Sequence, residues 1–170
     1  MVLKGIIDED LVNYKKISMV LEFPNCSFKC DKESGSQICQ NAALANVSSI
    51  HIDYGHIIER YLNNPITEAI VFQGLEPFDS SLDVTNLVYA LRVLYDCHDD
   101  IVIYTGYTKE ELETMPVLGG IVKEPILTKL KEYDNIIIKY GRFLPNQDSH
   151  YDEILGVDLA SPNQYAEKLC

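Results

Sequence analysis

Three cysteines lie close together in the first quarter of the sequence. Cys26, Cys30 and Cys39 fall within fourteen positions, whereas Cys97 and Cys170 are isolated from them and from each other. Thiolates are soft ligands that suit zinc, copper(I) and iron–sulfur clusters. An odd number of cysteines, in a chain whose first residues do not resemble a signal peptide, argues against a disulfide framework. The spacing therefore predicts metal chemistry on these three thiols.

The number of available ligands distinguishes a zinc site from an iron–sulfur cluster. A structural zinc site closes around four ligands, and the nearest histidines, His51 and His56, are expected at the start of or inside a helix beyond the cysteines. Three thiolates on a four-iron cluster leave one iron open, which is what a substrate-binding cluster requires. That iron can bind the amino and carboxylate groups of S-adenosylmethionine, whose sulfonium bond is then broken by one electron. A zinc-binding module and three metal-free buried thiols are the simpler alternatives.

The elements around the cysteines predict an α/β fold. Apolar runs at residues 17–23, 69–72, 101–104 and 136–139 indicate strands. Helices are expected over 54–62, from 79 or 80 to about 95, from 109 after a Thr108 cap, and over 124–133. The strands are apolar throughout rather than alternating, which is typical of a mainly parallel sheet covered by helices. Ligands of such sheets bind beyond the carboxyl ends of the strands, where the following loops converge.

Composition limits the partners. The formal net charge is −12, and no local cluster of Lys and Arg offsets it. Such a surface repels phosphate backbones, so nucleic acid is not an expected partner. No apolar run approaches the length that spans a bilayer. We expect a single cytoplasmic domain over residues 1–170, with a polar loop from Cys26 to Cys39.

A family resemblance extends along the chain. Residues 23–30 (FPNCSFKC) resemble the strand-to-loop entry of radical SAM enzymes, above all the small activases of glycyl-radical enzymes such as anaerobic ribonucleoside-triphosphate reductase. Four further stretches are similar to activase motifs and occur in the same order: Gly74-Leu75-Glu76-Pro77, Tyr104-Thr105-Gly106-Tyr107, Gly141-Arg142-Phe143 and Ser161-Pro162-Asn163-Gln164. The resemblance covers about residues 6–164.

The resemblance implies a fold, cofactors and partners. The fold is a partial (βα) barrel of the small radical SAM type, with a cluster loop at 24–40. Cys26, Cys30 and Cys39 are the implied ligands of a [4Fe–4S] cluster. The implied contacts of S-adenosylmethionine are Phe28, Gln73, Gly74, Leu75, Glu76, Tyr104 and Thr105, with Glu76 accepting from its ammonium group. No side chain acts as acid or base. The implied partners are a large glycyl-radical enzyme and a flavodoxin- or ferredoxin-type electron donor.

Three departures from the family pattern affect this interpretation. The usual spacing is Cys-x3-Cys-x2-Cys, whereas eight residues separate Cys30 from Cys39. Leu75 replaces a glycine and restricts the turn if that position needs positive φ. Tyr140 stands where the family carries an aspartate. A radical SAM enzyme acting on a small molecule, similar to 7-carboxy-7-deazaguanine synthase, and a non-catalytic zinc module therefore remain alternatives.

Several other polar residues have ordinary interpretations. Cys97 and His98 fall beside aspartates at a helix end, which favours a solvated turn over a metal site. Residues 150–153 have no partner motif and are expected to form a solvated loop. Asn163 and Gln164 are either a helix cap and a surface amide or part of the site.

Overall fold

The fold is built on a mixed, largely parallel sheet. The computed structural model describes residues 1–119 and 123–169, and Cys170 lies outside them. The main sheet has six strands in the order β10-β7-β6-β5-β3-β2. Its four inner strands are parallel, namely β3 (Ser18–Phe23), β5 (Ala69–Gly74), β6 (Asp100–Tyr104) and β7 (Ile136–Tyr140). Two antiparallel strands, β2 (Gly5–Asp10) and β10 (Tyr165–Lys168), form the edges. The predicted α/β class is confirmed, and the partial barrel stays a prediction.

Helices and two small antiparallel strand pairs accompany the main sheet in the described part of the chain. The helices are α1 (Lys29–Ser34), α2 (Tyr54–Leu62), α3 (Ser81–Tyr89), α4 (Lys109–Thr114) and α5 (Ile126–Leu130). Short 3-10 turns are η1 (Ala42–Asn46) and η2 (Pro77–Ser80), and a π-helical turn, η3 (Ala90–Leu94), prolongs α3. The two pairs are β1 (Val2–Leu3) with β4 (Ile50–His51), and β8 (His150–Asp152) with β9 (Val157–Leu159). The helix predicted at 54–62 is confirmed, and the one predicted at 124–133 is shorter.

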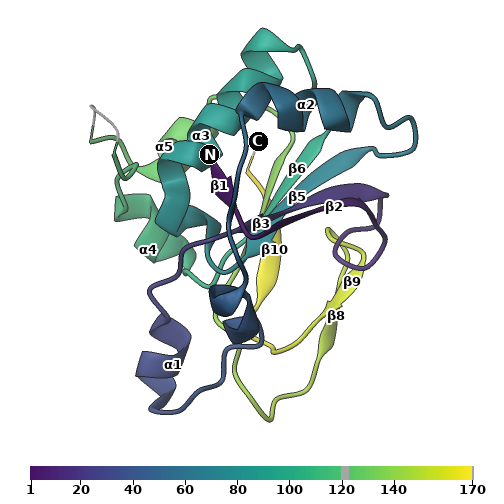
Figure 1. The fold of residues 1–170 in the computed structure, drawn as a ribbon. Helices are drawn as coiled ribbons and strands as arrows, with labels where there is room; N and C mark the ends of the chain where they lie inside the picture. The colour runs from purple at the N-terminus through teal and green to yellow at the C-terminus, as the bar shows by residue number, and fades with distance from the viewer. Residues whose placement is uncertain (120–122, 170) are drawn as a thin grey trace.

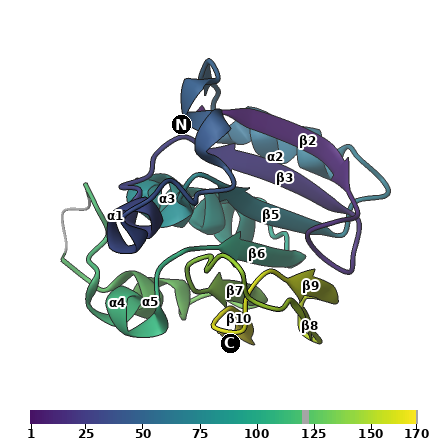
Figure 2. The same ribbon diagram turned by 90° about the horizontal axis from the view of Figure 1, so that it is seen from below.

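The two faces of the sheet are covered differently. Alternate strand residues such as Leu21, Phe72 and Ile138 pack with α2, α3 and α5 in the larger apolar cluster. The intervening residues, including Val71 and Val102, pack in a smaller cluster with Leu155 and Leu159 around the β8–β9 pair. Figures 1 and 2 show α2, α3 and α5 on one face and the β8–β9 pair on the other. The predicted helical cover is therefore present on one face only.

The structure corrects three predictions for polar segments. Residues 26–39 are not entirely a loop, because α1 begins directly after Phe28. Residues 150–152 are strand β8, and the buried Asp152 carboxylate accepts three backbone N–H groups, from Ile154, Leu155 and Ala166. Cys97 is also buried rather than in a solvated turn, although the neighbouring His98 is exposed.

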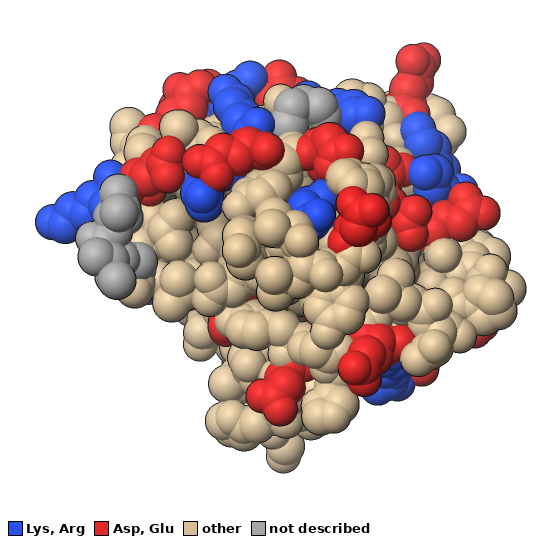
Figure 3. Space-filling view, turned by 90° about the horizontal axis from the view of Figure 1, so that it is seen from above, with Lys and Arg blue, Asp and Glu red and all other residues tan. Residues whose placement is uncertain are grey.

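The charged surface is mixed. On the face drawn in Figure 3, acidic and basic side chains lie side by side, with no broad Lys/Arg patch among the described residues in view. None of the helices in the described part of the chain is long and apolar enough to cross a membrane.

Candidate functional site

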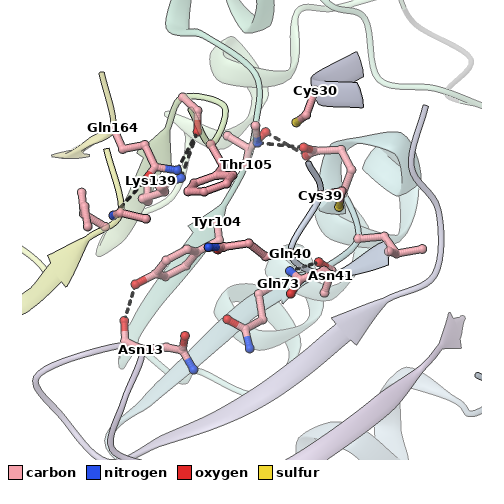
Figure 4. A pocket seen from close by; sticks show the side chains of 18 of the residues that line it. Asn13, Cys30, Cys39, Gln40, Asn41, Gln73, Tyr104, Thr105, Lys139 and Gln164 are labelled. Carbon is pink, nitrogen blue, oxygen red and sulfur yellow. Dashed lines mark hydrogen bonds between the residues drawn. The ribbon is translucent and has the colours of Figure 1, made fainter. Parts of the chain in front are cut away.

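A cavity of about 390 Å³ opens at the carboxyl ends of the parallel strands (Figure 4). Its lining includes nine of the ten predicted site residues: Cys26, Cys30, Cys39, Gln73, Gly74, Leu75, Glu76, Tyr104 and Thr105. Phe28 is the exception. The fold thus brings together residues that are up to 79 positions apart in the sequence, from Cys26 to Thr105. The position agrees with the rule for ligand sites in parallel sheets.

Strand register determines which side chains face the cavity. Gln73, Tyr104 and Lys139 each follow, by two residues, a residue of the smaller apolar cluster on the same strand. Side chains two apart share a face of a strand, so all three project beyond that cluster. Tyr104 and Lys139 are direct register partners on β6 and β7. Val157, Asp158 and Leu159 of β9 also line the cavity, which therefore lies between the strand ends, β9 and the cysteine segment.

The turn after β5 requires a glycine at its first position only. Gly74 has φ +98°, and a Cβ there would lie 2.7 Å from the backbone nitrogen of Phe23. Leu75 is not among the described residues with positive φ, and its N–H donates to the carbonyl of Phe23 at 3.1 Å. The replacement of the family's second glycine by Leu75 therefore imposes no left-handed strain on this turn.

Glu76 connects the ends of β5 and β6. Its side chain is buried; Oε1 accepts from Thr105 Oγ1 at 2.8 Å and from the Phe78 N–H at 3.1 Å. Oε2 accepts from the Gly106 N–H at 2.9 Å. Burial raises the pKa of Glu76 to about 7, although these hydrogen bonds oppose the shift. Oε2 has one acceptor position left for a donor in the cavity.

Lys139 is a site residue that sequence reasoning missed. Its ammonium group is buried in the cavity wall and donates to the Gly141 carbonyl at 2.9 Å. Burial lowers the pKa of Lys139 to about 8. An ammonium has three donors, so two remain for a ligand. The available signal was a lysine at the end of an otherwise apolar strand, at a face position where burial is expected.

Gln164 also lies in the cavity wall rather than on the surface. Its Nε2 donates to the Gly141 carbonyl at 3.2 Å, and its Oε1 accepts from the Ala160 N–H at 3.1 Å. The side chain is thereby fixed behind Lys139. Tyr140, by contrast, packs in the larger apolar cluster on the other face of the sheet and does not line the cavity. The position of the family's aspartate consequently contributes no side chain to this cavity.

The three predicted ligands are free, partly exposed thiols. Phe28 has φ 52°, and this turn lets its N–H donate to Cys26 Sγ at 3.2 Å. Burial raises the pKa of the Cys26 thiol to about 11, and the acids Glu76 and Asp79 act in the same direction. Metal binding requires the thiolate, so a bound cation must supply the compensating positive charge.

Polar contacts fix the cysteine segment to the rest of the site. The Ser27 N–H and the Tyr107 hydroxyl both donate to Asp79, each at 2.6 Å. Glu111 Oε1 accepts from Lys29 at 3.0 Å and from Arg142 at 2.7 Å. These cations hold the pKa of Glu111 at about 2, with the Arg142 hydrogen bond as the largest cause. The segment is therefore held by charge and hydrogen bonds at its beginning.

The end of the segment is held as well. Asn41, two residues after Cys39, donates from Nδ2 to the Gly74 carbonyl at 2.7 Å (Figure 4). The cysteines thus sit between two anchors on the turn that follows β5. Neither Asp79 nor Asn41 was predicted from the sequence, because hydrogen bonds to a distant turn leave no local pattern.

The donor set fits a cluster of several irons. In the described part of the chain, no three His, Cys, Asp or Glu side chains lie close enough to hold one metal ion. A four-iron cluster instead binds each cysteine through a different iron. The three thiols line one cavity, an N–H points at one sulfur, and the Lys139 and Arg142 cations lie nearby to offset negative charge.

Comparison with known proteins gives one match. The sequence model of a protein family described as "4Fe-4S single cluster domain" matches residues 16–153. No curated protein and no solved structure matched the chain significantly. The matched range includes all three cysteines, the turn at Gly74 and the buried Lys139.

Proposed function

The chain belongs to the family of 4Fe-4S single cluster domains, and from this premise we propose that Cys26, Cys30 and Cys39 bind one [4Fe–4S] cluster used for radical chemistry with S-adenosylmethionine. The observation that carries the proposal is the shared cavity. Three thiols, the turn at Gly74 and the buried Lys139 all line it. Held by these three cysteines, the cluster would supply the electron for the reductive cleavage of S-adenosylmethionine, which gives methionine and a 5′-deoxyadenosyl radical.

The chain's own residues supply binding and orientation. Lys139 offers two unused donors at a buried position, which suits the carboxylate of the methionine moiety. Glu76 Oε2 retains an acceptor position for its ammonium group. The Lys139 ammonium and the Glu76 carboxylate would together orient the amino-acid end of the ligand. Thr105 and Gly106 keep the Glu76 carboxylate in place through hydrogen bonds of 2.8 and 2.9 Å.

We infer that the acceptor of the radical is a glycine residue of a large glycyl-radical enzyme, with anaerobic ribonucleotide reductase as the leading partner. The resemblance of the motifs at 104–107 and 161–164 to those of activases supports this assignment. A flavodoxin- or ferredoxin-type protein is the corresponding electron donor, and the cytoplasm the corresponding compartment. A radical SAM enzyme acting on a small molecule is the alternative outcome of the partner experiment below.

The first experiment tests the cluster and its use. The chain is reconstituted anaerobically with iron and sulfide, reduced with dithionite, and incubated with S-adenosylmethionine. We expect 5′-deoxyadenosine from the wild type and none from Cys39→Ser. Cys97→Ser is the matched control, because Cys97 lies outside the cavity, and it should retain cluster and product. A fully loaded wild type that forms no 5′-deoxyadenosine would contradict the radical function but not the cluster.

The second experiment tests the acceptor. The loaded chain is mixed with the candidate reductase under the same conditions and the mixture is examined by electron paramagnetic resonance. An activase leaves a stable glycyl radical on the partner. Formation of 5′-deoxyadenosine without any protein radical would instead favour the small-molecule alternative.

A further inference from the structure

The eight residues between Cys30 and Cys39 form a closed excursion rather than an open loop. Helix α1 begins at Lys29 and ends at Ser34, and Gly35 follows in the left-handed region with φ 68°. Ser34 Oγ then donates to the Ser36 carbonyl at 2.7 Å. The end of α1, the left-handed Gly35 and the Ser34 hydrogen bond together reverse the direction of the chain, so that the polypeptide returns toward Cys30.

Asp31 closes the excursion at its base. Its Oδ1 accepts from the backbone N–H of Ile38 at 2.8 Å and from that of Cys39 at 2.9 Å. Asp31 follows Cys30 directly in the sequence. One carboxylate oxygen therefore joins the residue after the second cysteine to the backbone of the third. Hydrogen bonds to an ionised acceptor are among the stronger ones in proteins, and two from consecutive amides define the direction of the peptide.

Apolar packing does not fix this segment. None of the residues of α1 is buried. Two ion pairs also hold α1, between Glu33 and Arg142 at 3.1 Å and between Lys29 and Glu111 at 3.0 Å. These pairs hold the helix but do not touch Ile38 or Cys39. Asp31 accordingly ties Cys39 to the residue that follows Cys30, while Asn41 fixes the chain beyond Cys39 to the turn at Gly74.

We propose that Asp31 is the positioning residue of the third cluster ligand, because it ties the backbone of Cys39 to the residue that follows Cys30 across the eight residues between the two cysteines. This inference rests on the proposed function for the identity of the ligands. Asp31 acts through the backbone of Cys39 and does not itself contact the cluster. The inserted residues are thereby kept outside the ligand geometry instead of altering it.

The geometry can be tested in the metal-free chain. Amide hydrogen exchange of Ile38 and Cys39 is compared in wild type, Asp31→Ala, Asp31→Asn and Lys32→Ala. Lys32 lies next to Asp31 in α1 and is exposed, so Lys32→Ala is the matched control. Exchange of both amides should be at least about tenfold faster in Asp31→Ala, because an unbonded amide loses its protection. Asp31→Asn keeps an acceptor oxygen and should be intermediate. Unchanged exchange in Asp31→Ala would overturn the inference.

The consequence for the cluster is then measured on the same four variants. Iron and sulfide per chain, the electron paramagnetic resonance spectrum and the rate of iron loss to a chelator are recorded after reconstitution. Asp31→Ala should lose iron at least about tenfold faster than Lys32→Ala, with partial rescue in Asp31→Asn. If Asp31→Ala has the wild-type spectrum and the wild-type rate of iron loss, the inference about Asp31 is overturned, whereas the ligand assignment stands. Failure of the wild type to load, or an intact cluster in Cys39→Ser, would overturn the ligand assignment and with it this inference.

Discussion

The two sides of the cavity are built in different ways. On the sheet side, Gln73, Tyr104 and Lys139 extend strands whose inner residues are almost completely buried. On the other side, the cysteine segment from Cys26 to Cys39 contributes no residue to the buried core. Burial fixes the first side, because each strand residue is surrounded by packed neighbours. Charged and polar contacts fix the second.

This difference indicates how each side responds to change. A packed strand end tolerates little change in side-chain volume, and its stability depends weakly on salt, apart from the buried charge of Lys139. Contacts such as Lys29 with Glu111 are weaker, screened by salt and sensitive to protonation. The cysteine segment can therefore adapt when a cluster binds, while the sheet side supplies a fixed wall. Substitutions on the two sides should therefore differ in how strongly they change the free energy of unfolding.

A matched pair of glycine substitutions gives the largest difference. In Gly74→Ala the new Cβ would lie 2.7 Å from Phe23 N and 2.9 Å from backbone atoms of Glu22, at φ +98°. We expect a loss of about 3–5 kcal/mol in the free energy of unfolding. Gly35→Ala, with φ +68° and nothing within 4 Å, should lose only about 1 kcal/mol. Urea unfolding of the metal-free chain measures both, and equal losses would contradict the contrast.

Replacing Lys139 should stabilise the chain. Burial lowers its pKa from 10.5 to about 8, so below pH 8 the native state bears a penalty of at most about 3 kcal/mol for the buried charge. Lys139→Met removes this penalty, and Gly141 keeps a donor in Gln164. We expect the free energy of unfolding at pH 7 to rise by about 1–3 kcal/mol, while binding of S-adenosylmethionine weakens.

The pH dependence of stability tests whether the buried charge of Lys139 is the cause of this effect. Between pH 8 and 10.5 native Lys139 has released its proton and the unfolded chain has not, so wild-type stability rises with pH in that window. The advantage of Lys139→Met should accordingly shrink from pH 7 to pH 10. An advantage that grows over this range would contradict burial of the charge as its origin.

Strand patterns explain why the sheet side was largely predictable. Each inner strand is an uninterrupted apolar run, and the residues after it converge on one edge by topology alone. The edge strands β2 and β10 were not predicted, because GIIDED and YAEK carry too few apolar residues to indicate a strand. The β8–β9 pair was missed for a similar reason. Asp152 joins its turn and the neighbouring β10 through three backbone hydrogen bonds, which leave no hydrophobic pattern in the sequence.

The sequence predicted which residues line the site, but not the residues that hold them in position. The cysteines and the turn at Gly74 are marked by residue type, and they do line one cavity. The sequence predicts Lys139 only as the end of a strand. When a strand is apolar throughout, its sequence does not indicate which of its two faces borders a cavity. Asp31 lay in what reads as a polar loop, and its two hydrogen bonds become visible only once the excursion is folded.

Neutralising Glu111 should loosen the cysteine segment with a moderate loss of stability. Glu111→Gln keeps the size of the side chain but removes the charge that Lys29 and Arg142 share. We expect a loss of about 1 kcal/mol at low salt that shrinks at high salt, together with faster alkylation of Cys30. Because the pKa of Glu111 is lowered to about 2, the contribution is complete at neutral pH and falls as pH drops below 4.5 toward 2.

The control for that experiment is Glu132→Gln, which removes an exposed pair with Lys129 far along the chain from the cysteines. It should change stability by a few tenths of a kcal/mol and leave thiol alkylation unchanged. Equal alkylation rates in the Glu111 and Glu132 variants would show that the ion pairs do not hold the segment.

Glu33→Gln should have the smallest effect. Its carboxylate is 3.1 Å from Arg142 Nε but lacks hydrogen-bond geometry, and its side chain is 57% exposed. Arg142 keeps its bond to Glu111 when Glu33 is changed. The expected loss is therefore a few tenths of a kcal/mol and vanishes at high salt, with amide exchange at Cys39 unchanged because Asp31 still binds that amide. Faster exchange at Cys39 in Glu33→Gln would mean that the ion pair of Glu33 with Arg142, and not Asp31 alone, sets the position of the third cysteine.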